Sequence, residues 1–175
     1  NLVPKDKFYC ELLFLKTTAF SVKNDPRLIH SNFTANFAPI LVNMIINENL
    51  KGKLLKAALT IISYCISLND VEIDGQRFTE LLIRSFIEAE NDTLIEKILV
   101  VFTLLHKANI TNFEYYFVHN DLLLDKCISL YSNSYNNSNL VTKLFSNFNQ
   151  DHKKNIFDYC MNVFLEKSVN CFVLL

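Results

Sequence analysis

Glycine and proline are scarce in this sequence: its 175 residues include 2 Gly and 3 Pro, and tryptophan is absent. Tight hairpin and βα turns place residues at positive φ, where glycine is the default. Two glycines cannot supply many such turns, and their scarcity also excludes glycine-rich phosphate-binding loops. Half of the residues are hydrophobic, which is too apolar for a disordered chain. The composition therefore predicts an all-α globular fold with a sizeable buried core.

The chain also lacks an excess of charge of either sign. Lys and Arg total 17 against 18 Asp and Glu, so the net charge is −1. Nucleic-acid-binding proteins usually carry a basic surplus or a basic face. The clearest basic group here is the short cluster Lys51, Lys53 and Lys56, which is typical of a solvated helix face. We therefore expect no nucleic acid among the partners.

The five cysteines show no Cys-x-x-Cys spacing, and their odd number argues against a complete disulfide framework. Buried free cysteines behave as small hydrophobic residues. This usage predicts a reducing compartment, the cytoplasm or the nucleus. Four Asn-x-Ser/Thr sequons occur, but the chain has 21 asparagines, so such matches arise by composition alone.

No segment has the length of a membrane span. The longest uncharged apolar stretch runs from Ala57 to Leu68, and a spanning helix needs about 20 apolar residues. The first residues lack the basic-then-apolar order of a signal peptide. Because the chain does not begin with methionine and ends in an apolar stretch, we expect it to be a piece of a longer protein.

The spacing of apolar residues is helical throughout the chain. Leu54, Ala58, Ile61 and Cys65 follow the i, i+4, i+7 pattern of one buried helix face. The segment from Leu94 to Leu105 is apolar almost all the way round, which predicts a helix enclosed by neighbours on several sides.

Candidate helix starts can also be read from the sequence. Thr93 and Glu96 match the capping box, and plainer N-caps are expected at Asn49, at Asn120 or Asp121, and at Ser138. The polar tract 132–138 predicts a loop, the most flexible internal piece of the chain.

These elements recur along the chain. Three units, at residues 37–69, 77–109 and 120–150, each predict a shorter helix, a polar turn bearing asparagine and a second, more apolar helix. Equivalent positions such as Ile45, Phe86 and Ile128 lie 41 and 42 residues apart. A period near 40 with paired helices is typical of an α-solenoid. We expect one repeat domain over 1–175, with partial units at 1–36 and 151–175 and about 8–10 helices in all.

The first unit resembles the armadillo/HEAT class of helical repeats. It carries a proline-led apolar start at 39–42, a polar turn at 47–49 and an Ala-Ala-x-Leu-like second half at 56–59. The resemblance covers residues 37–165 and implies a right-handed superhelical stack of helix pairs or triplets. It also implies a non-catalytic scaffold that binds other macromolecules. Importin-type members use a ladder of tryptophans, and the absence of Trp here speaks against their peptide-clamping role.

Motifs of catalysis and of metal binding are missing from the sequence. The four histidines form no His-Glu-x-x-His and no zinc-ligand cluster with the cysteines. The two glycines lie in no nucleophile elbow and in no kinase-type loop. We expect neither an enzyme nor a cofactor, a metal or a small-molecule substrate.

The predicted function is a protein–protein interaction scaffold, a helical-repeat module of a larger intracellular complex subunit. Four aromatic residues close together in 113–117 cannot all face inward from one helix, so some of them are candidates for contact with a partner helix or peptide. The candidate partner-binding residues are Phe113, Tyr115, Tyr116, Phe117, Lys51 and Lys53.

A second interpretation is a compact helical bundle of the Bcl-2 type, as in viral inhibitors of cell death or signalling. Residues 74–78 are similar to that family's glycine-arginine motif ahead of a long apolar helix. In such a bundle the helix at 94–105 would be central and wrapped by the others, whereas in a solenoid it would contact only its sequence neighbours.

Overall fold

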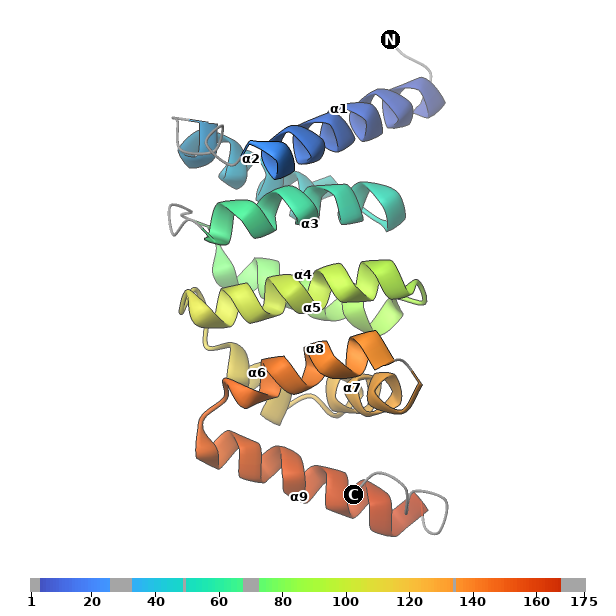
Figure 1. The fold of residues 1–175 in the computed structure, drawn as a ribbon, viewed down its shortest axis with the longest axis vertical. Helices are drawn as coiled ribbons and strands as arrows, with labels where there is room; N and C mark the ends of the chain where they lie inside the picture. Colours follow the sequence, from blue (N-terminus) through green and yellow to red (C-terminus); the bar gives the residue numbers. More distant parts are fainter. Residues whose placement is uncertain (1–3, 26–32, 49, 68–72, 134, 168–175) are drawn as a thin grey trace. The chain divides into compact units, whose positions relative to one another are not determined.

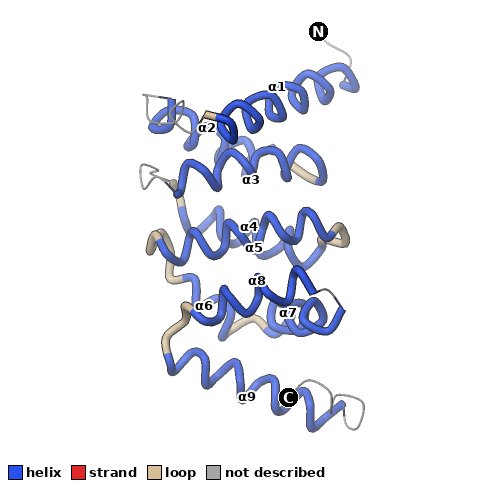
Figure 2. Tube along the Cα trace, viewed as in Figure 1, coloured by secondary structure: helices blue, strands red, loops and turns tan. Residues whose placement is uncertain are grey.

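The computed structural model describes residues 4–25, 33–48, 50–67, 73–133 and 135–167. Over these residues the chain is all-α, as predicted: they form nine helices, and they contain no strand (Figures 1 and 2). The chain divides into two compact units, Asn1–Thr111 and Asn112–Leu175, where one repeat domain was expected. The first unit contains α1–α5 and the second contains α6–α9.

The five helices of the first unit form two layers. In one layer α3 lies between α1 and α5 and packs against both of them (Figure 1). The other layer contains α2 and α4, which contact each other and also pack against α3 and α5, respectively. The bounds of these helices are α1 Pro4–Asn24, α2 Phe33–Glu48, α3 Gly52–Ser67, α4 Gly75–Glu88 and α5 Asp92–Lys107.

The buried faces of this unit follow the apolar spacing of the sequence. The predicted stripe Leu54, Ala58, Ile61 and Cys65 is buried along α3. Helix α5 also buries most of its apolar residues, and the rings of Phe86 in α4 and Phe102 in α5 meet edge to face, with centroids 5.6 Å apart. These interactions form the core that holds the two layers together.

The helix starts are capped by asparagine and aspartate. Asp74 caps α4, and Asn120 caps α7 as predicted, each by accepting a hydrogen bond from the backbone N–H three residues on. The capping box at Thr93 is wrong, because α5 begins earlier and the side-chain oxygen of Asn91 accepts from the backbone N–H of Leu94. The predicted cap at Ser138 is also wrong, because residue 138 lies inside α8, and the cap predicted at Asn49 lies outside the described residues.

A Schellman turn ends α5 and explains the position of a glycine. Asn109 adopts φ 51°, and the N–H of Ile110 donates to the carbonyl of Leu105 at 3.2 Å. This turn carries the backbone of Ile110 against the start of α4. A Cβ on Gly75 would lie 2.6 Å from the Ile110 carbonyl oxygen, so only glycine fits there without movement.

The second unit is built on an aromatic core. The rings of Phe117, Phe145 and Phe148 contact one another, with centroids 5.4 to 5.5 Å apart, and Phe113 joins the cluster 5.1 Å from Phe117. Helix α6 packs against α7 and α9, and α7 packs against α8. The bounds of these helices are α6 Phe113–Val118, α7 Asp121–Asn133, α8 Tyr135–Ser146 and α9 Gln150–Lys167.

The loop predicted over 132–138 is wrong, since α7 continues to residue 133 and α8 begins at residue 135. Asn137 is buried and occupies the same helix face as Val141 and Leu144, at i, i+4 and i+7. The burial of this face extends the helix back into a segment whose residues individually favour turns.

Candidate functional site

A groove of about 310 Å³ opens within the first unit and is a candidate for a binding site. Three segments meet there: the start of α3, the second half of α4 and the first turn of α5. The residues that line it are Lys51, Gly52, Leu55, Leu81, Arg84, Ser85, Glu88, Ala89 and Leu94.

The groove combines an apolar floor with a charged rim. Leu55 and Ala89 are buried at its base, whereas the rim residues Lys51, Arg84 and Glu88 are exposed. The Nζ atom of Lys51 lies 3.9 Å from Oε2 of Glu88, and their side chains are 71% and 59% exposed, so this ion pair is weak. Arg84 has no carboxylate partner within the described part of the chain. The rim therefore presents one more cation than anion.

Hydrogen bonds between helices hold one side of the groove. Lys56 Nζ in α3 donates to Oγ1 of Thr93 at 2.7 Å, and that hydroxyl donates to Oδ1 of Asn91 at 2.7 Å. The same Asn91 oxygen caps α5 at Leu94, a lining residue. The α5 cap is thus tied to α3. Gly52, another lining residue, begins α3 at φ 54° and has open space where a Cβ would lie.

The predicted partner-binding residues fall into different environments. Lys51 is on the groove rim, and Lys53 is exposed one residue past Gly52. Tyr115 in α6 is 53% exposed, and its ring contacts that of His119 at a tilt, with centroids 4.3 Å apart, while Tyr116 is half-buried.

Two of the aromatic residues predicted to contact a partner are buried, so the prediction is wrong for them. Phe113 and Phe117 are 1% and 0% exposed. They lie four positions apart on the inner face of α6, where they form the aromatic core, so a partner cannot reach their side chains.

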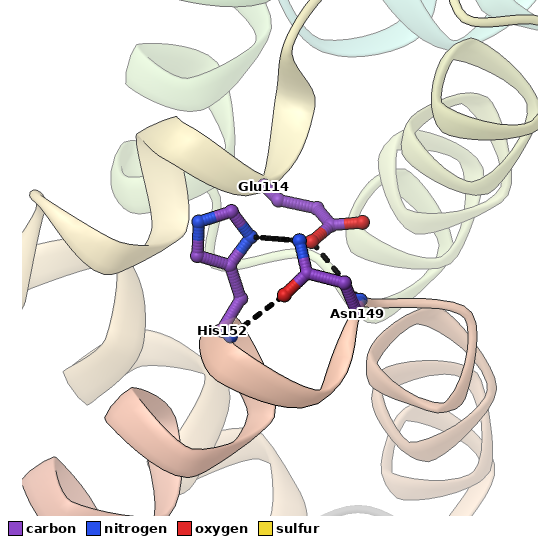
Figure 3. Close-up of polar contacts among 3 residues, drawn as sticks. All are labelled: Glu114, Asn149 and His152. Carbon is purple, nitrogen blue, oxygen red and sulfur yellow. Dashed lines mark hydrogen bonds and ion pairs between the residues drawn. The ribbon is translucent and has the colours of Figure 1, made fainter.

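The second unit contains a polar cluster that the sequence did not indicate (Figure 3). Oε2 of Glu114 in α6 accepts from the backbone N–H of Asn149 at 3.1 Å and lies 2.5 Å from Nδ1 of His152. The side-chain oxygen of Asn149 accepts from the backbone N–H of His152 at 2.8 Å and caps α9. Glu114 and His152 are 38 residues apart, and no spacing rule relates them.

This cluster joins two helices of the second unit, α6 and α9. Its acceptors and donors are used to hold the start of α9 against α6. A further link joins α9 to α7, because the hydroxyl of Tyr159 donates to Asp125 at 3.2 Å. Desolvation and the neighbouring Asp125 carboxylate raise the pKa of Tyr159 to about 12, so this donor keeps its proton at neutral pH.

Two further observations concern metals and membranes. Within the described ranges, no three His, Cys, Asp or Glu side chains are grouped so that they could hold a metal ion. No described helix is both long enough and apolar enough to cross a bilayer.

Comparisons of this chain with protein-family models, with curated proteins and with solved structures found no match.

Proposed function

We propose that this protein is a non-catalytic interaction module of the armadillo/HEAT-like class, part of a larger intracellular complex subunit. Its groove holds a helix or peptide segment of a partner protein. The observation that carries this proposal is the apolar floor of Leu55 and Ala89 beneath the exposed cations Lys51 and Arg84.

The packing of the first unit supports a stack of helix pairs. Helix α5 packs against α3 and α4, its near neighbours in the sequence, and the layers alternate along the chain. This pattern is typical of repeats in which each pair buries its apolar face against the next pair. The Bcl-2-type alternative instead requires α5 to be a central helix enclosed by the others. Among the described helices of this unit, no packing interaction favours that arrangement over the stack.

The chemistry of the rim indicates an acidic partner segment. A guanidinium such as that of Arg84 offers a planar fork of donors that matches a carboxylate. The floor would accept an aliphatic side chain next to that carboxylate. At about 310 Å³ the groove is at the small end for enclosing a drug-sized molecule, which favours side chains presented by a larger partner.

Peptide display on the immobilised full chain tests this proposal. We expect wild-type protein to enrich peptides that pair Asp or Glu with Leu, Ile or Phe. The Arg84→Glu variant should bind those peptides at least about tenfold more weakly, since a repulsive charge replaces the attractive one. Lys143→Glu, a charge reversal on the exposed face of α8, is the matched control and should bind as wild type does.

Two results would contradict the proposal. One is that the wild-type chain enriches no family of peptides. The other is a family that binds Arg84→Glu and wild type with equal affinity while both proteins have the same melting temperature.

A further inference from the structure

Large apolar side chains are concentrated on the exposed side of α1. Of the nine exposed large hydrophobic residues in the described part of the chain, four belong to this helix. Their exposed fractions are 57% for Tyr9, 68% for Leu13, 55% for Phe14 and 69% for Phe20. Solvent-exposed apolar residues are ordinary when scattered, but a contiguous group marks an interaction surface.

These residues lie away from the face that α1 uses for folding. Leu12, Leu15 and Val22 are buried on the side that packs against α3. At about 100° per residue, Tyr9, Leu13 and Phe20 fall within about 40° of one another, whereas Phe14 lies about 100° or more around the helix from each of them. We call Tyr9, Leu13 and Phe20 the outer face of α1.

The layer itself shows how a helix would cover this face. Helix α3 packs between α1 and α5, whereas α1 has α3 as its main neighbour (Figure 1). A helix lying on the outer face would meet α1 as α1 meets α3. The spacing of Tyr9, Leu13 and Phe20, at i, i+4 and i+11, is that of anchors in helix–helix recognition.

Lysines border the outer face. Lys16 and Lys23 are exposed along one edge, two helical turns apart, and neither has an ion-pair partner among the described residues. The ion pair of Lys7 with Glu11, at 3.4 Å, lies more than about 100° around the helix from this face. The edge that carries Lys16 and Lys23 therefore has positive charge alone.

We propose that the outer face of α1 docks an amphipathic helix of a partner protein, with acidic residues two turns apart facing Lys16 and Lys23. Two copies of this chain fit less well, because antiparallel pairing of α1 with itself would bring these lysine edges together. Anionic membranes are recognised by clusters of roughly four to eight basic residues, more than the two that this edge offers.

Two synthetic stapled helices test this docking on the full chain. Both carry the same leucine stripe, and they differ only in having two Glu or two Lys along one edge, seven positions apart. By fluorescence anisotropy, wild type should bind the Glu-edged helix. Replacing Leu13 and Phe20 together by Ser should weaken binding about tenfold or more, because the apolar anchors are lost. Leu122→Ser, at a leucine that is 65% exposed on α7, is the matched control and should bind as wild type does.

Charge reversal makes the test specific to the edge. The double variant Lys16→Glu, Lys23→Glu should prefer the Lys-edged helix, which excludes a general loss of folding as the cause. The proposal is overturned if wild type binds both helices equally. It is also overturned if wild type binds neither helix, or if it self-associates or binds phosphatidylserine vesicles through Leu13 and Phe20.

This inference rests on the proposed interaction role but uses a different surface. Arg84→Glu should leave binding of the Glu-edged helix unchanged. The proposal for the groove and the proposal for the outer face of α1 can therefore be refuted independently.

Discussion

Removal of one buried hydroxyl should make this protein more stable. Thr79 in α4 is fully buried, and its Oγ1 has no hydrogen-bond partner among the described residues. Burial of a hydroxyl without a partner costs about 1–3 kcal/mol. Thr79→Val replaces the hydroxyl with a methyl group of similar size and keeps the β-branched shape. We expect the free energy of unfolding to rise by about 1 kcal/mol.

Thr103 in α5 is the matched control for this substitution. It is also buried, but its Oγ1 donates to the carbonyl of Leu99 at 3.0 Å. Thr103→Val removes that hydrogen bond and should lower the free energy of unfolding by up to about 1 kcal/mol. The two variants have the same change in composition and helix propensity, so the difference between them isolates the hydrogen bond.

Urea unfolding followed by circular dichroism measures both variants. With a slope of about 2 kcal/mol per M, the midpoint for Thr79→Val should rise by about 0.5 M. The midpoint for Thr103→Val should stay the same or fall. If Thr79→Val is no more stable than wild type, its hydroxyl has a hydrogen-bond partner and the reasoning is refuted.

Three other features allow direct tests. Gly75→Ala should destabilise the protein by about 1–2 kcal/mol in urea unfolding, because its Cβ would lie 2.6 Å from the Ile110 carbonyl oxygen. This clash should outweigh the better helix propensity of alanine, and an increase in stability would contradict the close approach. Glu114→Ala should lower the free energy of unfolding by about 2 kcal/mol, because the backbone N–H of Asn149 loses its acceptor. Amide exchange at the start of α9 should then rise. Unchanged exchange there would argue against Glu114 as the clamp that holds α9 to α6. Burial raises the pKa of Cys65 from 9.0 to about 11, so the stability gained by keeping this thiol protonated is present below pH 9 and is lost as pH rises towards 11. At pH 8 peptide mapping after alkylation should find the exposed Cys10 modified and Cys65 protected, and equal modification would refute the burial.

Local patterns in the sequence were sufficient for the helices and for much of the core. The stripe through Leu54 and Cys65 and the apolar segment 94–105 predicted α3 and α5, because a 3.6-residue period leaves one continuous face to bury. The scarcity of glycine was also informative, because it excluded a fold with many tight turns. The two glycines stand at helix starts, where one adopts positive φ and the other admits a close backbone approach, and Asn109 supplies the one other positive φ among the described residues.

Tertiary packing decided the rest. The sequence placed four aromatic residues in 113–117, but only the packing of α6 separated the buried Phe113 and Phe117 from the exposed Tyr115. The groove joins residues 51 to 94 from three helices, and Glu114 meets His152 across 38 positions. Periodicity reports which face of a helix is buried, but it carries no information about the neighbour that buries it. For this reason the helices could be read from the sequence, whereas the groove, the clamp on α9 and the division into two units required the structure.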